Sequence, residues 1–303
     1  MRYLVTGAAG FIGSHLSEVL GAKGHEVVGL DCFTDYYDPA LKRENARGLD
    51  VRDVDLADDA LDFDGIDGVF HLAGQPGVRS FGDVFPLYLR RNLLASQRVF
   101  EAAARDGVKV VFASSSSVYG AAESYPTAED TVPHPLSPYG ITKLACEQLA
   151  DAYRRQFGLE CVVLRYFNAF GPRQRPDMAF TRIANALATG GRFELFGDGT
   201  QSRSWTYVGD VVDATIAALD GDGTYNVGGA LEASMNESIE LFERLAGATL
   251  DVERYPDPVP GDQRRTKADT NRIRAELGWE PRISLEEGAA LQWSWASANV
   301  PAA

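Results

Sequence analysis

A glycine-rich turn near the start of the chain constrains its fold more than any other feature. The apolar run 3–6 leads into Gly7-Ala8-Ala9-Gly10-Phe11-Ile12-Gly13, and apolar residues then recur at helical spacing. Glycines in this pattern permit a tight turn, close approach of the backbone to a pyrophosphate, and close packing of helix on strand. The N-terminus of the helix offers free N–H groups and a positive dipole end to an anion. The pattern predicts a dinucleotide-binding strand–turn–helix unit whose cofactor contacts include Gly7, Gly10, Phe11, Ile12 and Gly13.

Strand-like and helix-like stretches alternate through the first half of the chain. Runs rich in β-branched and aromatic residues predict strands, and helical patterns lie between them, notably at 86–105 and 138–157. This alternation favours the α/β class, with a Rossmann-type doubly wound parallel sheet and right-handed crossovers. The order changes after Gly171-Pro172, where short strands and helices become mixed. We therefore expect a cofactor-binding domain at 1–172, which a segment near 205–228 rejoins, and a smaller mixed α/β substrate lobe at 173–303.

Asp31 ends the second predicted strand, where an acidic side chain can accept hydrogen bonds from both ribose hydroxyls of a dinucleotide. A carboxylate there repels the 2′-phosphate of NADP, so the predicted cofactor is NAD. The alternative is that Asp31 only ends the strand.

A helix start at Ser137-Pro138 carries the first candidate catalytic pair. Ser137 has the residue type of an N-cap, and proline is favoured in the first helical turn. Tyr139 and Lys143 then lie on one face of the helix. A free tyrosine titrates near pH ~10, so a nearby cation is needed to stabilise the phenolate near neutral pH. The alternative for such a pair is a solvated helix face.

A serine run at the end of the strand predicted at 108–114 strengthens the interpretation of Tyr139 and Lys143 as a catalytic pair. It reads Ser114-Ser115-Ser116-Ser117 and is followed by Val118-Tyr119-Gly120. Ligands of doubly wound sheets bind at the carboxyl ends of the strands, so a hydroxyl there can bridge Tyr139 and a substrate oxygen. A plain serine-rich turn would not predict these elements in this order.

The charge balance excludes several classes of partner. The chain has 303 residues, with 43 Asp+Glu against 29 Lys+Arg and a formal net charge of −14. Such a field repels nucleic acids and anionic membranes. The three cysteines, Cys32, Cys146 and Cys161, lack the spacing of a metal or disulfide site, so we expect no metal site and no disulfide. No segment approaches the ~18 apolar residues of a membrane span, and we expect a cytoplasmic protein.

Together, these motifs resemble the extended short-chain dehydrogenase/reductase family, specifically its NAD-dependent nucleotide-sugar epimerases and dehydratases. The resemblance covers nearly the whole chain. It rests on the glycine turn, the serine run and the Tyr139/Lys143 pair, and also on His71-Leu72-Ala73-Gly74, Arg165-Tyr166-Phe167-Asn168 and Arg203-Ser204-Trp205-Thr206-Tyr207-Val208-Gly209-Asp210. It implies that Ser115, Tyr139 and Lys143 are the catalytic residues.

The resemblance also implies where the cofactor and the nucleotide bind. Asp50 and Val51 would flank the adenine, and Asn92 would support the active-site helix. The rest of the cofactor groove would include Leu72, Ala73, Gly74 and Tyr166. The sugar diphosphate would meet Asn168, Arg203 and either Arg264 or Arg265, between which the sequence does not choose.

The serines at positions 116 and 117 bear on the reaction. Similar 4,6-dehydratases have Asp-Glu at these positions, and similar decarboxylases have Glu at the second. Because neither acid is present, the resemblance favours 4-epimerisation, in which tyrosinate takes the C4 hydroxyl proton, hydride moves to NAD, and the 4-keto sugar turns over before hydride returns. Family dimers pair the helices predicted at 86–105 and 138–157, so a homodimer is expected.

The segments 31–43, 77–79 and 171–178 resemble UDP-glucuronate 4-epimerases most closely. A glucuronate carboxylate calls for guanidinium and hydroxyl donors, which Arg79, Arg175, Ser116 and Ser117 can supply; either arginine is alternatively a surface ion pair. Asn168 stands where glucuronate epimerases often have threonine, so UDP-glucose and UDP-N-acetylglucosamine remain alternative substrates. A non-catalytic NAD-sensing regulator would typically lack the tyrosine or the lysine, and Asp31 disfavours a reductase that uses NADPH.

Overall fold

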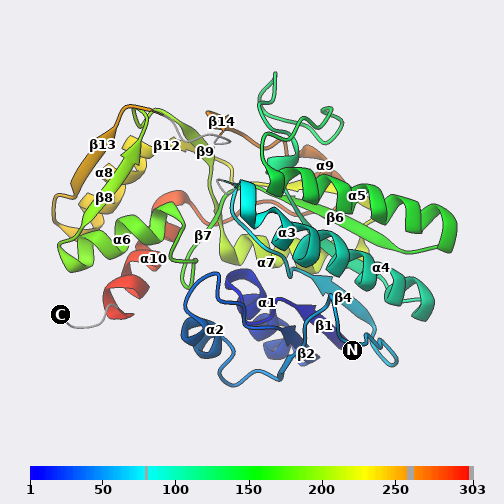
Figure 1. The fold of residues 1–303 in the computed structure, drawn as a ribbon. Coiled ribbons are helices and arrows are strands. Elements are labelled where there is room, and N and C mark those ends of the chain that lie inside the picture. Colours follow the sequence, from blue (N-terminus) through cyan, green and yellow to red (C-terminus); the bar gives the residue numbers. More distant parts are fainter. Residues whose placement is uncertain (79–80, 258–262, 300–303) are drawn as a thin grey trace.

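A computed structural model describes residues 1–78, 81–257 and 263–299. Its main element is a seven-stranded parallel sheet (Figure 1). In spatial order the strands are β11 (Gly223–Val227), β6 (Cys161–Tyr166), β5 (Val110–Ser115), β4 (Gly68–His71), β1 (Arg2–Thr6), β2 (Glu26–Asp31) and β3 (Val51–Asp53). The strand order reverses between β1 and β4, and ligands of such sheets bind at the carboxyl ends beside this switch point.

Helices cover both faces of the sheet (Figure 1). Tyr3, Phe70 and Tyr225 belong to the core beneath α1 (Phe11–Ala22) and α7 (Val208–Ala217). Leu4, Val69 and Phe112 belong to the core beneath α4 (Ala95–Asp106) and α5 (Pro138–Phe157). Three shorter helices flank these layers: α2 (Pro39–Asn45), α3 (Phe85–Tyr88) and α9 (Asn271–Leu277). The predicted α/β doubly wound fold is confirmed, because the sheet is buried on both faces as parallel sheets require.

The smaller lobe lies at the left of Figure 1 and has its own aromatic core around Phe180, Trp205 and Phe242. Its helices are α6 (Ala179–Thr189), α8 (Met235–Ala246) and α10 (Leu285–Asn299). Its short sheets pair β8 (Arg192–Phe196) with β13 (Asp251–Tyr255), and β9 (Ser202–Ser204) with β12 (Glu232–Ser234) and β14 (Arg265–Thr266). A further pair, β7 (Ala169–Phe170) and β10 (Thr206–Tyr207), connects the lobe to the main sheet region.

Two predicted elements differ in detail from the structure. The single helix expected at 86–105 consists of α3, a π-helical stretch η2 (Leu89–Leu94) and α4. Within η2, Asn92 is 1% exposed and hydrogen-bonds outside its own helix, which is a typical setting for a π-turn. The segment expected near 205–228 is divided among a short strand at 206–207, α7 and β11, of which β11 joins the seven-stranded sheet. Among the described residues, no helix is both long and apolar enough to cross a membrane.

Candidate active site

The glycine turn has the geometry that a dinucleotide pyrophosphate needs. Gly7 has a φ of +70°, and a Cβ on Gly13 would lie 2.1 Å from the carbonyl oxygen of Gly7. The helix α1 then begins at Phe11, and its N-cap Gly10 supplies no side-chain hydrogen bond. The first N–H groups of α1 therefore keep their capacity to bind an anion. The turn fits a bound dinucleotide because its glycines line a cavity at the helix end and bring no side chain of their own into it.

A large cavity begins at this turn and runs along the carboxyl ends of the strands. Tyr139, Lys143 and Arg175 line it as well, so the turn and the candidate catalytic pair share one cavity. The predicted cofactor residues that line it are Gly7, Gly10, Phe11, Ile12, Gly13, Asp31, Leu72, Ala73, Gly74, Tyr139, Lys143 and Tyr166.

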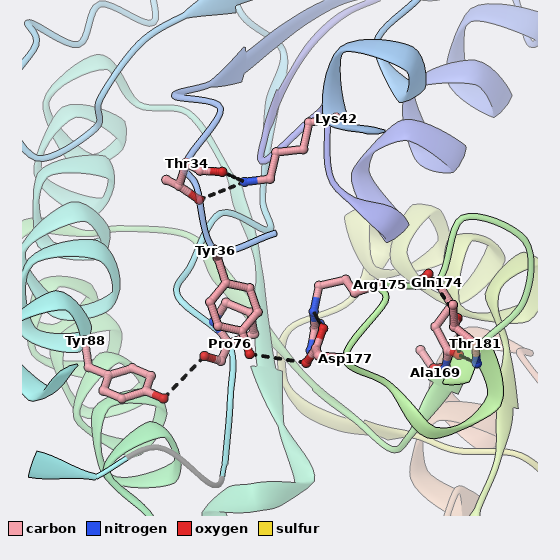
Figure 2. Close-up of polar contacts among 10 residues, drawn as sticks. All are labelled: Thr34, Tyr36, Lys42, Pro76, Tyr88, Ala169, Gln174, Arg175, Asp177 and Thr181. Atoms are coloured by element: carbon pink, nitrogen blue, oxygen red, sulfur yellow. Dashed lines mark hydrogen bonds and ion pairs between the residues drawn. The ribbon is translucent and has the colours of Figure 1, made fainter. Parts of the chain in front are cut away.

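Asp31 lies at the end of β2 beside the glycine turn. Its carboxylate accepts hydrogen bonds from the N–H groups of Ala9, at 3.1 Å, and Phe33, at 2.9 Å. Burial raises the pKa of Asp31, although these hydrogen bonds and the charge of Lys42 act in the opposite direction. Lys42 donates to both the carbonyl and the hydroxyl oxygen of Thr34 (Figure 2). Sequence reasoning gave Lys42 and Thr34 no role, although both line the cavity.

Asp50 and Val51 are not among the residues that line this cavity, and their contact with the adenine stays a prediction. Val51 begins β3, and the carbonyl oxygen of Asp50 accepts a hydrogen bond from Gly29 at 2.7 Å. Asp55 and Leu56, which follow the carboxyl end of β3, line the cavity instead. An aspartate followed by an apolar residue occurs both at 50–51 and at 55–56, and only the position of the end of β3 distinguishes the two pairs.

The candidate catalytic pair projects from the start of α5. Ser137 caps this helix by accepting a hydrogen bond from the N–H of Gly140 at 3.1 Å. Lys143 is 4% exposed, and its ammonium donates to the carbonyl oxygen of Ala113 at 2.8 Å. That ammonium lies 6.0 Å from the centre of the Tyr139 ring. Both side chains line the large cavity, so the ammonium and the tyrosine ring share one wall of it.

Asn92 lies behind this pair and does not line the cavity. Its side-chain carbonyl accepts from the N–H of Gln75 at 2.6 Å, and its amide donates to the hydroxyl of Thr142 at 3.1 Å. The structure therefore places Asn92 between the loop after β4 and the first turns of α5.

The serine run separates the large cavity from a second, smaller one. Ser114 lines the first cavity, whereas Ser116 and Ser117 line the second. Ser115 lies between them and caps a short 3₁₀ helix, η3 (Ser116–Val118), by accepting from the N–H of Ser117 at 3.1 Å. The second cavity is also lined by Val78, Leu136, Ser137, Asn168, Arg203 and Gln263.

The predicted substrate arginines lie in different settings. Arg203 is 8% exposed and lines the second cavity. Arg264 is exposed and makes no side-chain hydrogen bond or ion pair with any described residue, whereas Arg265 is paired with Glu232 at 2.7 Å. The two candidates that the sequence left open thus differ in their ion pairing. Arg79 lies outside the described residues.

Arg175 lines the large cavity and is paired with Asp177 (Figure 2). Its Nε and Nη2 donate to the two carboxylate oxygens of Asp177, each at 3.0 Å. Burial disfavours the charge on Arg175, but Asp177 outweighs this effect and raises the pKa of the guanidinium above its ordinary value. Sequence reasoning singled out Arg175 without identifying this partner, although Asp177 is only two positions away.

A glycine-lined dinucleotide cavity that also holds a tyrosine–lysine pair defines the class of NAD-binding enzymes with a Rossmann-type sheet. Residues 3–228 match the model of the NAD dependent epimerase/dehydratase family, and the chain belongs to this family. The predicted family resemblance and the predicted cofactor, NAD, are thereby confirmed.

Similar proteins cover nearly the full length of the chain. A Bacillus subtilis protein described as the uncharacterized UDP-glucose epimerase YtcB is 40% identical over 95% of each chain. A UDP-glucuronate 4-epimerase from Thermodesulfobacterium geofontis is 37% identical over 98% of this chain and 97% of its own. The crystal structure of UDP-glucuronic acid 4-epimerase from Bacillus cereus, in complex with UDP-glucuronic acid and NAD, has a TM-score of 0.95, at 37% identity, with 98% and 99% of the two chains covered.

Proposed function

We propose that the protein is an NAD-dependent UDP-sugar 4-epimerase that interconverts UDP-glucuronate and UDP-galacturonate. The observation that carries this proposal is the position of Tyr139, Lys143 and Arg175 in the wall of the cavity that begins at the glycine turn. The same cavity then contains Tyr139 as the proton acceptor, Lys143 as the cation that stabilises its phenolate, and Arg175 as a guanidinium that can bind a carboxylate. The relatives named above support the activity, and their names include both glucose and glucuronate epimerases.

The cofactor and the nucleotide sugar are assigned to different parts of the chain. We assign NAD to 1–172 together with the segment near 205–228, and the nucleotide sugar to the lobe at 173–303. Within the substrate site, Asn168, Arg203 and Arg264 bind the diphosphate, and Arg175, Ser116 and Ser117 bind the carboxylate at C6; the role predicted for Arg79 falls on a residue outside the described ranges. Among the described residues the Arg264 side chain has no hydrogen-bond or ion-pair partner, whereas Arg265 is paired with Glu232, which favours Arg264 for the diphosphate.

The catalytic residues handle the proton of the C4 hydroxyl. Tyr139 accepts this proton, Ser115 hydrogen-bonds the C4 oxygen, and Lys143 stabilises the phenolate. When bound, NAD supplies the acceptor and donor of the C4 hydride. Ser116 and Ser117 supply no carboxyl group for elimination of water or for decarboxylation, which favours return of the keto sugar to either C4 epimer.

The direct test is incubation of the purified protein with UDP-glucuronate, without added NAD, followed by identification of the product. Formation of UDP-galacturonate is expected if the cavity that begins at the glycine turn retains NAD through purification. In the same assay, Tyr139→Phe should lower turnover by roughly 10²–10⁴-fold and retain NAD. Normal turnover by this variant would refute the role of Tyr139.

A UDP-glucose 4-epimerase is the second candidate, because Asn168 lines the second cavity where related glucuronate epimerases often have threonine. UDP-glucose and UDP-N-acetylglucosamine should be offered in parallel. A higher kcat/KM for either sugar than for UDP-glucuronate would transfer the proposal to that substrate.

We also propose a cytoplasmic homodimer that pairs α3, η2 and α4 with α5. Leu89, Leu94 and Ile141 expose apolar side chains on these elements. Light scattering after size-exclusion chromatography tests the assembly, and a monomer at micromolar concentration would contradict it.

A further inference from the structure

Asp177 hydrogen-bonds only one edge of the Arg175 guanidinium. Asp177 occupies the Nε/Nη2 edge, and Nη1 makes no hydrogen bond with any residue in the described part of the chain. A guanidinium carries five N–H donors in a rigid fork, so a second carboxylate can still bind end-on. The side-on pair therefore fixes the plane of the guanidinium and leaves one edge for a ligand in the cavity.

Asp177 is itself held by a residue from the other half of the molecule. The hydroxyl of Tyr36, in the loop after β2, donates to Oδ2 of Asp177 at 3.2 Å across 141 positions of sequence (Figure 2). The Tyr36 ring lies 5.9 Å from the guanidinium carbon of Arg175. Burial works against ionisation of Asp177, but Arg175 and Tyr36 outweigh it and keep its pKa below the ordinary value. Asp177 thus stays ionised and accepts hydrogen bonds on both oxygens.

We propose that Asp177, held by Tyr36, is a positioning residue that orients Arg175 toward the C6 substituent of the sugar and thereby sets the preference for a carboxylate there. This inference rests on the proposed function, in which Arg175 binds the C6 carboxylate. Asp177 need not touch the substrate, because its effect passes through Arg175.

A positioned arginine binds better than a mobile one because its rotamer freedom is lost before the ligand arrives. The Arg175 side chain is 23% exposed and that of Asp177 is 39% exposed, so solvent weakens their Coulomb attraction. The fixed orientation of the guanidinium then contributes more to substrate binding than the charge of Asp177 does. The rotamer entropy that an unpaired arginine would lose on binding corresponds to about tenfold in affinity. The same reasoning predicts no effect on a sugar with a hydroxymethyl group at C6.

The test compares affinities for UDP-glucuronate and UDP-glucose in the NAD-loaded Tyr139→Phe protein, where turnover does not disturb calorimetric titration. Asp177→Ala is expected to weaken UDP-glucuronate binding about tenfold, or ~1.4 kcal/mol, and to change UDP-glucose binding less than twofold. Asp177→Asn, which keeps one acceptor oxygen, and Tyr36→Phe, which keeps the ring, should each weaken UDP-glucuronate binding about two- to threefold. These two variants also test the proposal if Asp177→Ala folds poorly.

Glu18→Ala is the matched control. Glu18 pairs with Arg173 at 2.8 Å, in the same loop as Arg175, and lies outside the site. This variant should leave both affinities unchanged. In an Arg175→Gln background, Asp177→Ala should have no further effect, as expected for a residue that acts through Arg175.

Several outcomes would overturn the inference. They are parallel weakening for both sugars, an effect of Asp177→Ala that persists without Arg175, an equal effect of Glu18→Ala, or tighter UDP-glucuronate binding in Asp177→Ala. The last result would make Asp177 a competitor of the substrate. Failure of the proposed function is seen separately, as no C4 epimer formed by the wild-type protein even when the affinities behave as expected.

Discussion

The two cavities on either side of the serine run are built in different ways. The larger one starts at a glycine turn between β1 and α1, where Gly7, Gly10 and Gly13 offer only backbone to the cavity. The smaller one is lined by side chains from separate loops and short strands, including Asn168 and Arg203. Asn168 even has a φ of +26°, so its backbone is irregular where the side chain is needed.

This difference determines how each cavity tolerates change. A backbone site depends on the absence of side chains, and one added methyl group is enough to close it. A side-chain site depends on partners that hold each group, as the hydroxyl of Thr266 accepts a hydrogen bond from the amide of Asn168. Substitutions at the glycine turn should therefore have large, all-or-none effects, whereas substitutions of single side chains should be graded.

The largest expected effect comes from Gly13→Ala. The new Cβ would lie 2.1 Å from the Gly7 carbonyl oxygen, which is backbone and has no room to move. We expect loss of bound NAD and at least a hundredfold loss of activity, on the order of the 10²-fold cost of a 1 Å misplacement. Gly21→Ala on the same helix is the control. Its Cβ would meet no atom within 4 Å, so it should retain NAD and gain about 0.5–1 kcal/mol of helix stability. NAD content and thermal melting measure both variants; retained NAD in Gly13→Ala would contradict the steric argument.

Asp31→Asn should have the next largest effect on cofactor binding. Removing the charge ends the repulsion of a 2′-phosphate and also weakens the hydrogen bonds to the ribose. The ratio of NADP to NAD affinity is therefore expected to rise about tenfold or more, which is ~1.4 kcal/mol. Competitive titration of cofactor-free protein gives this ratio. An unchanged ratio would mean that Asp31 only ties the Ala9 and Phe33 N–H groups to the end of β2.

The difference between the two cavities also explains which site residues could be predicted from the sequence. The glycine turn, Asp31 at a strand end and the Ser137-Pro138 helix start follow local rules, so their positions were predictable. Asp55 and Leu56 were missed because the end of β3, rather than the residue pattern, decides which Asp-apolar pair reaches the cavity. The contact of Tyr36 with Asp177 was out of reach, because it depends on how two distant loops are folded together.

Acid should destabilise the folded protein through His71, at the end of β4. This ring is fully buried between the hydroxyls of Thr6 and Ser96, and burial together with the charge of Lys143 lowers its pKa to about 3. The unfolded chain binds a proton below pH ~6.5 and the folded chain does not, so stability falls as the pH falls from there toward 3. Between pH 7 and 5 this amounts to about 2 kcal/mol of unfolding free energy. Chemical denaturation at both pH values should show that His71→Gln lacks this part of the loss; equal losses in both proteins would refute it.

The smallest effect tests the irregular backbone of the second cavity. Asn168 tolerates its positive φ, and its amide donates to the hydroxyl of Thr266 at 2.8 Å. Asn168→Thr and Asn168→Gly both lose this hydrogen bond, but only threonine is β-branched and strained at that φ. The threonine variant should therefore be less stable than the glycine variant by about 1 kcal/mol, measured by denaturant unfolding. If the two are equally stable, the strain at this position is negligible, and the choice between asparagine and threonine is then governed by contacts with the bound sugar nucleotide.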